Sequence, residues 1–184
     1  TLRDEGHAAE ALARFREALA ARPADTTLRR EVFWVEADAT PAAALASADV
    51  LLQRMPLDAA VRERAIATAS AAGREDLVVR WARDGAARHP GEARWPRHEG
   101  ESALRRKDTS AAIDAFRRAC ARGTEASDRA MLAFAYESAG RAREAWQAWR
   151  EGPTPAVAAR ADWRDGLLRT TIGTAPLDEA DRQP

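Results

Sequence analysis

The chain has 184 residues, of which 46% are hydrophobic and 32% are charged, a composition typical of a folded globular protein and far from that of a disordered chain. Its 29 basic and 29 acidic residues give a formal net charge of zero, so there is no broad positive field to hold nucleic acid or an anionic membrane surface. A single cysteine excludes an internal disulfide, and no apolar run approaches the roughly 20 residues needed to span a bilayer.

Alanine is frequent and asparagine is absent, which favours helices along nearly the whole chain. Thr40 followed by Pro41 is typical of an N-cap and a first helical residue. Residues 1–5 are expected to be the remainder of a helix whose start is missing. Because the chain begins on Thr1 without methionine, and no signal peptide is visible, we expect a processed form or a fragment of a longer protein. The predicted helices cover about 8–21, 26–38, 41–54, 59–71, 74–88, 93–106, 109–121, 126–139 and 142–151.

Similar residues recur every 33 or 34 positions, which indicates an internal repeat. One register is expected in the turn between two helices and holds Gly6, Thr40, Gly73, Lys107 and Gly140. A second register holds residues that let neighbouring helices approach, namely Ala11, Leu45, Val78, Ala112 and Ala145. A third register should fill the gap between helix pairs and holds Phe15, Asp49, Ala82, Phe116 and Trp149. Prolines at 23, 56 and 90 are expected to end three successive second helices.

These registers resemble the tetratricopeptide repeat family, most completely in the run Leu132, Ala133, Tyr136, Gly140, Ala145 and Trp149. The resemblance implies an all-α fold, a right-handed superhelical solenoid of antiparallel helix pairs. It covers residues 1–152 as a partial first repeat plus four repeats. We assign 153–170 to a C-terminal capping helix and 171–184 to a loose tail.

Three positions depart from the family pattern. Asp49 and Ala82 stand where an aromatic residue is usual, and Glu99 occupies a normally apolar site. These departures predict an irregular superhelical geometry through the middle of the array. Most of the tryptophans at 81, 146, 149 and 163 are expected in the core, and Trp95 is expected to seal the joint between two repeats.

Stacked repeats of this family present their first helices on a concave face, where partners bind. Trp34 and Phe134 are candidate aromatic anchors, because aromatic residues and arginine dominate binding hot spots. The alternative is that Trp34 packs against a neighbouring helix and that the charges are solvated. A clamp of Lys and Asn for peptide C-termini is not expected, since there is no Asn and Lys107 falls in a turn. The candidate partner-binding residues are Arg30, Trp34, Glu63, Arg97, Glu101, Arg105, Phe134 and Glu137.

The sequence contains no complete motif of the catalytic or metal-binding kinds that were considered. His98 and Glu99 begin like a zinc-peptidase helix motif, but Ser102 stands where the second histidine is needed. Cys120 is expected to be a small core residue and not a nucleophile. We therefore predict no catalysis, no cofactor and no metal.

The sequence favours a scaffold that binds a protein or peptide partner, with no nucleic acid and no insertion of this fragment into a membrane. It indicates no particular oligomeric state. A first alternative is the periplasmic repeat region of a bacterial outer-membrane exopolysaccharide export protein. The composition of this chain, rich in Ala, Arg and Trp, resembles that of such regions. A second is a regulatory sensor module of a larger cytoplasmic protein. The single cysteine fits the cytoplasm and is compatible with the periplasm, toward which the first alternative leans.

Overall fold

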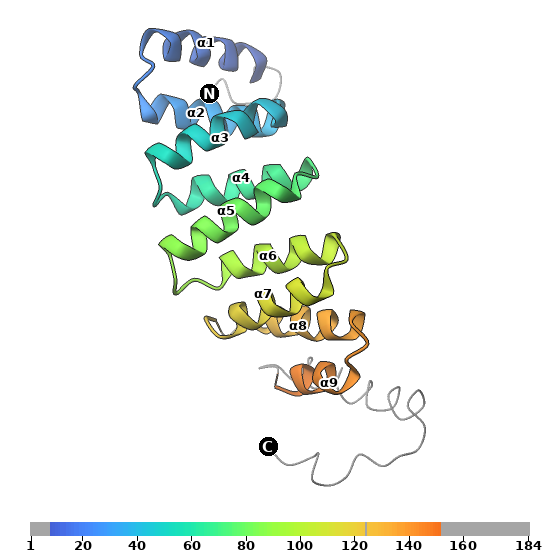
Figure 1. Cartoon of the computed structure of the whole chain (residues 1–184). Helices are drawn as coiled ribbons and strands as arrows, with labels where there is room; N and C mark the ends of the chain where they lie inside the picture. The colour runs from blue at the N-terminus through green and yellow to red at the C-terminus, as the bar shows by residue number, and fades with distance from the viewer. Residues whose placement is uncertain (1–7, 124, 152–184) are drawn as a thin grey trace. The chain divides into compact units, whose positions relative to one another are not determined.

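The computed structural model describes residues 8–123 and 125–151, and in these ranges every regular element is a helix (Figure 1). The bounds lie within one residue of the predicted ones. The predicted capping helix, the tail, the first-helix remainder and Gly6 lie outside the described residues. The helices are α1 (Ala8–Ala21), α2 (Thr26–Ala39), α3 (Pro41–Arg54), α4 (Ala59–Ala71), α5 (Glu75–Arg88), α6 (Arg94–Arg105), α7 (Thr109–Cys120), α8 (Ala126–Ser138) and α9 (Ala142–Arg150).

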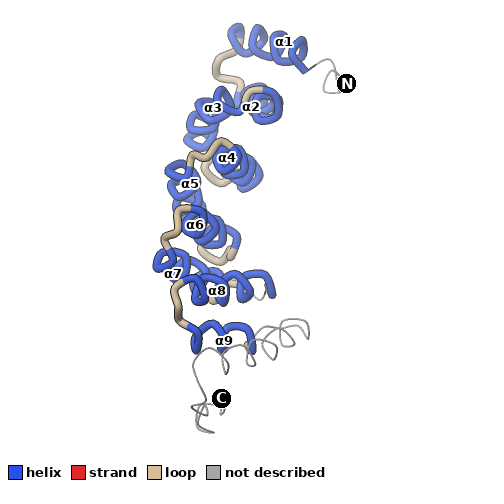
Figure 2. The backbone as a smooth tube through the Cα atoms, turned by 90° about the vertical axis from the view of Figure 1, so that its right-hand side faces the viewer, coloured by secondary structure: helices blue, strands red, loops and turns tan. Residues whose placement is uncertain are grey.

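The chain forms two compact units, Thr1–Ser102 and Ala103–Pro184, here called the N-terminal and C-terminal units. In the N-terminal unit α1 packs against α2, α2 against α3, α3 against α4, and α4 against α5. Figure 2 shows α2 and α4 on one side of this unit and α3 and α5 on the other. In the C-terminal unit α7 packs against α8, and α8 against α9. We call α2, α4, α6 and α8 first helices and the others second helices.

Small residues occupy the closest helix contacts, as the repeat registers predict. Ala44, Ala48 and Ala65 are fully buried in the core of the N-terminal unit, and Ala112 and Ala133 are fully buried in that of the C-terminal unit. Phe116 and Trp149 fill the C-terminal core beside them. Because alanine lets backbones approach closely and retains helix propensity, an alanine-rich sequence can build this fold with few large side chains.

Three of the predicted turns use one backbone motif. Gly73, Lys107 and Gly140 have φ values of 69°, 60° and 72°, in the left-handed region. In each case the residue donates its amide hydrogen to the carbonyl three residues earlier, and the next residue donates to the carbonyl five residues earlier. This is the Schellman motif, which satisfies carbonyls left open at a helix end. Thr40 departs from it with φ −143°, and Pro41 then begins α3 directly.

Three other turns begin with a proline, and two of them end in an aspartate that caps the next helix. Helices α1, α3 and α5 each end two residues before a proline, as predicted for Pro23, Pro56 and Pro90. Asp25 and Asp58 then accept hydrogen bonds from the amides of Leu28 and Val61, at 2.9 and 3.0 Å. An N-cap of this kind contributes about 1 kcal/mol to the stability of a helix.

The unusual residues at 49, 82 and 99 have specific partners. Trp81, which precedes Ala82, is buried in place of an aromatic at 82, and its Nε1 donates to Asp49 Oδ1 at 3.0 Å. Glu99 is buried and accepts from Arg83 Nε at 3.1 Å. Asp49 and Glu99 therefore form specific contacts at the partly exposed edge of the helix packing.

None of the helices in residues 8–123 and 125–151 is both long enough and apolar enough to cross a membrane.

Candidate partner-binding site

The predicted partner-binding residues divide between the two units. Arg30 and Trp34 lie on α2, and Glu63 lies on α4, all in the N-terminal unit. Arg97 and Glu101 lie on the part of α6 that belongs to the same unit. Arg105, Phe134 and Glu137 belong to the C-terminal unit.

Ion pairs join successive first helices of the N-terminal unit. Arg30 Nη1 lies 3.6 Å from Oδ2 of Asp58, the N-cap of α4. Arg94 Nη1 of α6 lies 3.3 Å from Glu63 Oε1 of α4. Arg64 of α4 pairs with Asp38 of α2. Together these pairs leave the first-helix side of the unit charged but locally balanced.

Trp34 of α2 lies beside α4. Its ring is half-buried, its centroid is 5.8 Å from that of Phe33, and Arg64 Cζ lies 5.7 Å over its face. A guanidinium above an indole face is attracted by the ring quadrupole. Trp34 therefore combines packing against its own helix with a surface that a partner can reach.

The C-terminal unit places its predicted residues differently. Phe134 is 50% exposed. Glu137 accepts a hydrogen bond from Trp149 Nε1 at 2.8 Å, so its carboxylate helps to hold a core indole. Arg105 is exposed at the end of α6.

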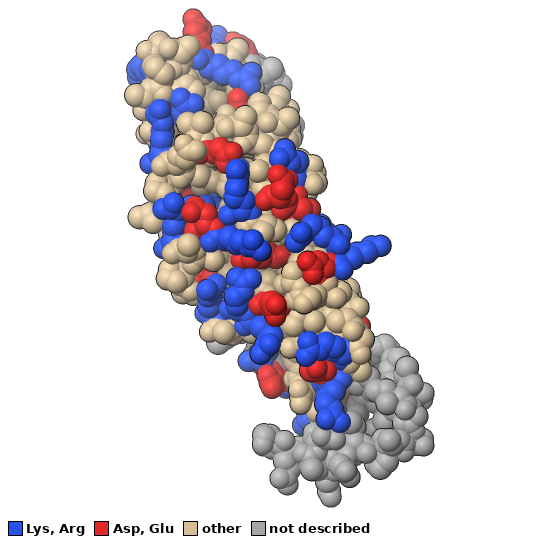
Figure 3. Space-filling view, viewed as in Figure 1, with Lys and Arg blue, Asp and Glu red and all other residues tan. Residues whose placement is uncertain are grey.

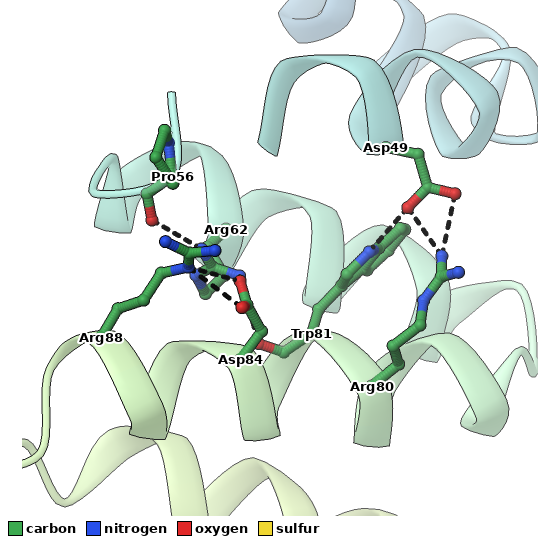
Figure 4. Close-up of polar contacts among 7 residues, drawn as sticks. All are labelled: Asp49, Pro56, Arg62, Arg80, Trp81, Asp84 and Arg88. Carbon is green, nitrogen blue, oxygen red and sulfur yellow. Dashed lines mark hydrogen bonds and ion pairs between the residues drawn. The ribbon is translucent and has the colours of Figure 1, made fainter. Parts of the chain in front are cut away.

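Between α4 and α5 a charge network surrounds one buried arginine (Figure 4). The Arg62 side chain is fully buried, lies 2.6 Å from Asp84 and donates to the Pro56 carbonyl at 2.7 Å. Arg88 Nε donates to both Asp84 oxygens, at 2.9 and 3.0 Å. Partial burial opposes ionisation of Asp84, but the hydrogen bond from Arg88 and the charge of Arg62 outweigh it and lower the pKa of that carboxyl.

A second polar cluster lies nearer the N-terminus of α5 (Figure 4). Arg80 Nη2 donates to both oxygens of Asp49, at 2.6 and 2.8 Å, and Arg80 Cζ lies 5.6 Å over the ring of Trp81. Figure 3 shows Arg and acidic side chains interspersed over this face of the N-terminal unit. That mixture leaves no large patch of one sign there.

The cysteine and the histidines give no sign of chemistry within the described residues. Cys120 is partly buried against the C-terminal core, and burial raises the pKa of its thiol, which disfavours the nucleophilic thiolate. No group of three His, Cys, Asp or Glu side chains in residues 8–123 and 125–151 is placed to hold a metal ion.

Solved structures with the same arrangement of helices decide the fold. A crystal structure of MamA aligns over 89% of this chain and 93% of its own, with a TM-score of 0.68 and 14% identity. MamA 41-end from Desulfovibrio magneticus RS-1 aligns over 91% and 89%, with a TM-score of 0.65 and 16% identity. TTC0263, a thermophilic TPR protein of Thermus thermophilus, aligns over 89% and 92%, with a TM-score of 0.55 and 20% identity. The chain has the tetratricopeptide-repeat fold. No family model and no curated protein sequence matches it.

Within this tetratricopeptide-repeat fold, Arg64 and Arg94 are two residues of this surface that were not predicted from the sequence. Both join first helices, and Arg64 also covers the predicted anchor Trp34. Arg64 directly follows the predicted residue Glu63, so a wider strip along α4 would have included it. Its position over Trp34 depends on the packing of α4 on α2, which the sequence of either helix alone does not contain.

Proposed function

We propose that this chain is a protein-binding scaffold and that the first-helix side of its N-terminal unit contacts the partner. The observation that supports this most directly is Trp34, half-buried and flanked by the Arg64–Asp38 ion pair. A rigid aromatic side chain offers a large contact area at a low entropic cost, and charged neighbours orient a partner. The tetratricopeptide-repeat fold supplies stacked helices on which such residues are held in place.

The proposal assigns no catalysis to the chain. It is supported by the ion pairs that several charged side chains form between helices and by the contacts of Trp34, which suit binding. Phe134 on α8 is a second candidate anchor, carried by the C-terminal unit. The export-protein and sensor-module alternatives concern a longer protein and stay predictions.

The test replaces Trp34 and Arg97 together by alanine and measures retention of proteins that co-purify with the wild-type chain. Circular dichroism establishes that the variant is folded. The control is Arg80→Ala. Like Arg64, Arg80 lies over a tryptophan ring, but both Arg80 and Trp81 belong to α5. We expect the double variant to lose its partners and the control to keep them. A folded double variant with unchanged partners would refute the proposed surface.

A further inference from the structure

Two clusters in the N-terminal unit contain the same three residue types. The first cluster, here the open trio, comprises Trp34, Arg64 and Asp38. The second, the closed trio, comprises Trp81, Arg80 and Asp49. In each, an arginine lies over an indole ring, at 5.7 Å in the open trio and 5.6 Å in the closed one, and pairs with an aspartate. Their differences indicate what each is for.

The carboxylate of the closed trio has two hydrogen-bond donors. Asp49 accepts from Trp81 Nε1 as well as from Arg80, and both of its oxygens are used. Trp81 is 3% exposed, so its indole is part of the core. Removing Asp49 would leave a buried indole N–H without an acceptor, which is costly. This carboxylate therefore has a structural role.

The carboxylate of the open trio, that of Asp38, has fewer contacts. The Asp38 side chain is 76% exposed, and within the described residues Arg64 is its one ion-pair or hydrogen-bond partner. Asp38 also lies in the last turn of α2, where the helix dipole disfavours a negative charge. It can therefore leave Arg64 at little cost.

The neighbouring ion pairs of the first helices are harder to open. Asp58, which pairs with Arg30, also caps α4 through the Val61 amide. Arg94, which pairs with Glu63, also contacts Glu92 at 3.0 Å. Of Arg30, Arg64 and Arg94, Arg64 is consequently the one whose present partner is most easily exchanged.

We propose that Asp38 occupies the place of a partner's carboxylate on Arg64, and that the partner is a peptide segment with an internal Asp or Glu next to a bulky apolar side chain. The incoming carboxylate would replace Asp38 on the guanidinium, and the apolar neighbour would contact Trp34. An internal residue is favoured over a chain end because ion pairs to α2 and to α6 extend the surface in both directions from Arg64. This inference rests on the proposed function and specifies its partner.

The test uses two short peptides blocked at both ends, one with a central Leu-Glu pair and one with Leu-Gln. Each is titrated into the isotope-labelled chain while the indole N–H signal of Trp34 is followed, assigned by Trp34→Phe. We expect the Leu-Glu peptide to bind more tightly than the Leu-Gln peptide. Asp38→Asn should tighten the Leu-Glu complex by about two- to fivefold, because a competing exposed carboxylate is removed. Arg64→Gln should make the two peptides bind equally.

The closed trio supplies the matched control, since Arg80→Gln should change neither peptide's affinity. Equal binding of the two peptides to the wild-type chain, or no shift of the Trp34 signal with either, would overturn the inference. Binding only of a peptide that ends in a free leucine carboxylate would also overturn it. If partner proteins require Trp34 but are unaffected by Arg64→Gln, the inference fails while the proposed function stands.

Discussion

Packing around Gly85 leaves no room for a larger side chain. A Cβ atom built there would lie 2.6 Å from Trp95 Cδ2 and 2.8 Å from Arg62 Cδ. Trp95 is fully buried, as expected for the residue that seals the joint between repeats, and it makes a ring contact with His89 at 5.9 Å. The glycine in α5 is thus required by the tryptophan of α6, although glycine in a helix is itself unfavourable by about 1 kcal/mol.

We therefore predict that Gly85→Ala destabilises the chain by about 1–3 kcal/mol, because overpacking outweighs the gain in helix propensity. Urea denaturation measures the change. Gly91→Ala is the control, since a Cβ there meets nothing within 4 Å, and it should be nearly neutral. A stabilised Gly85→Ala variant would contradict the packing described here.

Asp84 makes stability depend on pH. Its pKa in the folded chain is lowered, so the stabilisation it gives is complete above its unfolded pKa, about 3.9, and is lost as the pH falls through the lower folded value. We predict that the stability difference between the wild type and Asp84→Asn shrinks as the pH falls from about 5 to 2. Urea titrations at several pH values measure it. A difference that is constant over this range would show that Asp84 does not carry the effect.

At the scale of the element, the turns after α4, α6 and α8 use the same backbone motif with different residues. Gly73 and Gly140 take the left-handed conformation without steric cost, whereas Lys107 takes it with a side chain present. Arg141, which follows Gly140, also lies over the ring of Tyr136 at 4.9 Å, so the turn is packed as well as hydrogen-bonded.

This comparison predicts opposite effects for two substitutions in the C-terminal unit. Lys107→Gly should stabilise the chain by about 1 kcal/mol, because it removes strain at a positive φ. Gly140→Ala should destabilise it by a similar amount, about 1 kcal/mol, because it introduces that strain. Thermal denaturation of both variants checks the pair. The account of these turns fails if the two changes have the same sign.

At the scale of the whole molecule, charge balance governs which partners are attracted. The basic and acidic residues are equal in number, and many of the arginines are held by carboxylates or by aromatic rings. Arginines that are held in this way are less available to neutralise phosphates.

We accordingly predict no measurable binding to duplex DNA or retention on heparin at physiological salt. A gel-shift titration and a heparin column test this directly. Retention that weakens steeply with added salt would mean that the arginines are more available than their contacts indicate, and would reopen nucleic acid as a partner.

The sequence alone was sufficient for the repeat, the helix bounds and the fold, because helix propensity, proline stops, N-caps and turn glycines all act within a few neighbouring residues. The sequence also led to the prediction that Trp34 is an anchor, since the repeat places that residue on an exposed turn of a first helix. Only the tertiary structure showed Arg64 over Trp34, Trp95 against Gly85 and Arg62 buried beside Asp84. These contacts join residues about one repeat or less apart in the chain but on different helices. They depend on the conformations that long side chains adopt across a helix interface. A repeat register determines where a residue lies on its helix, but it does not determine the direction in which an arginine side chain extends.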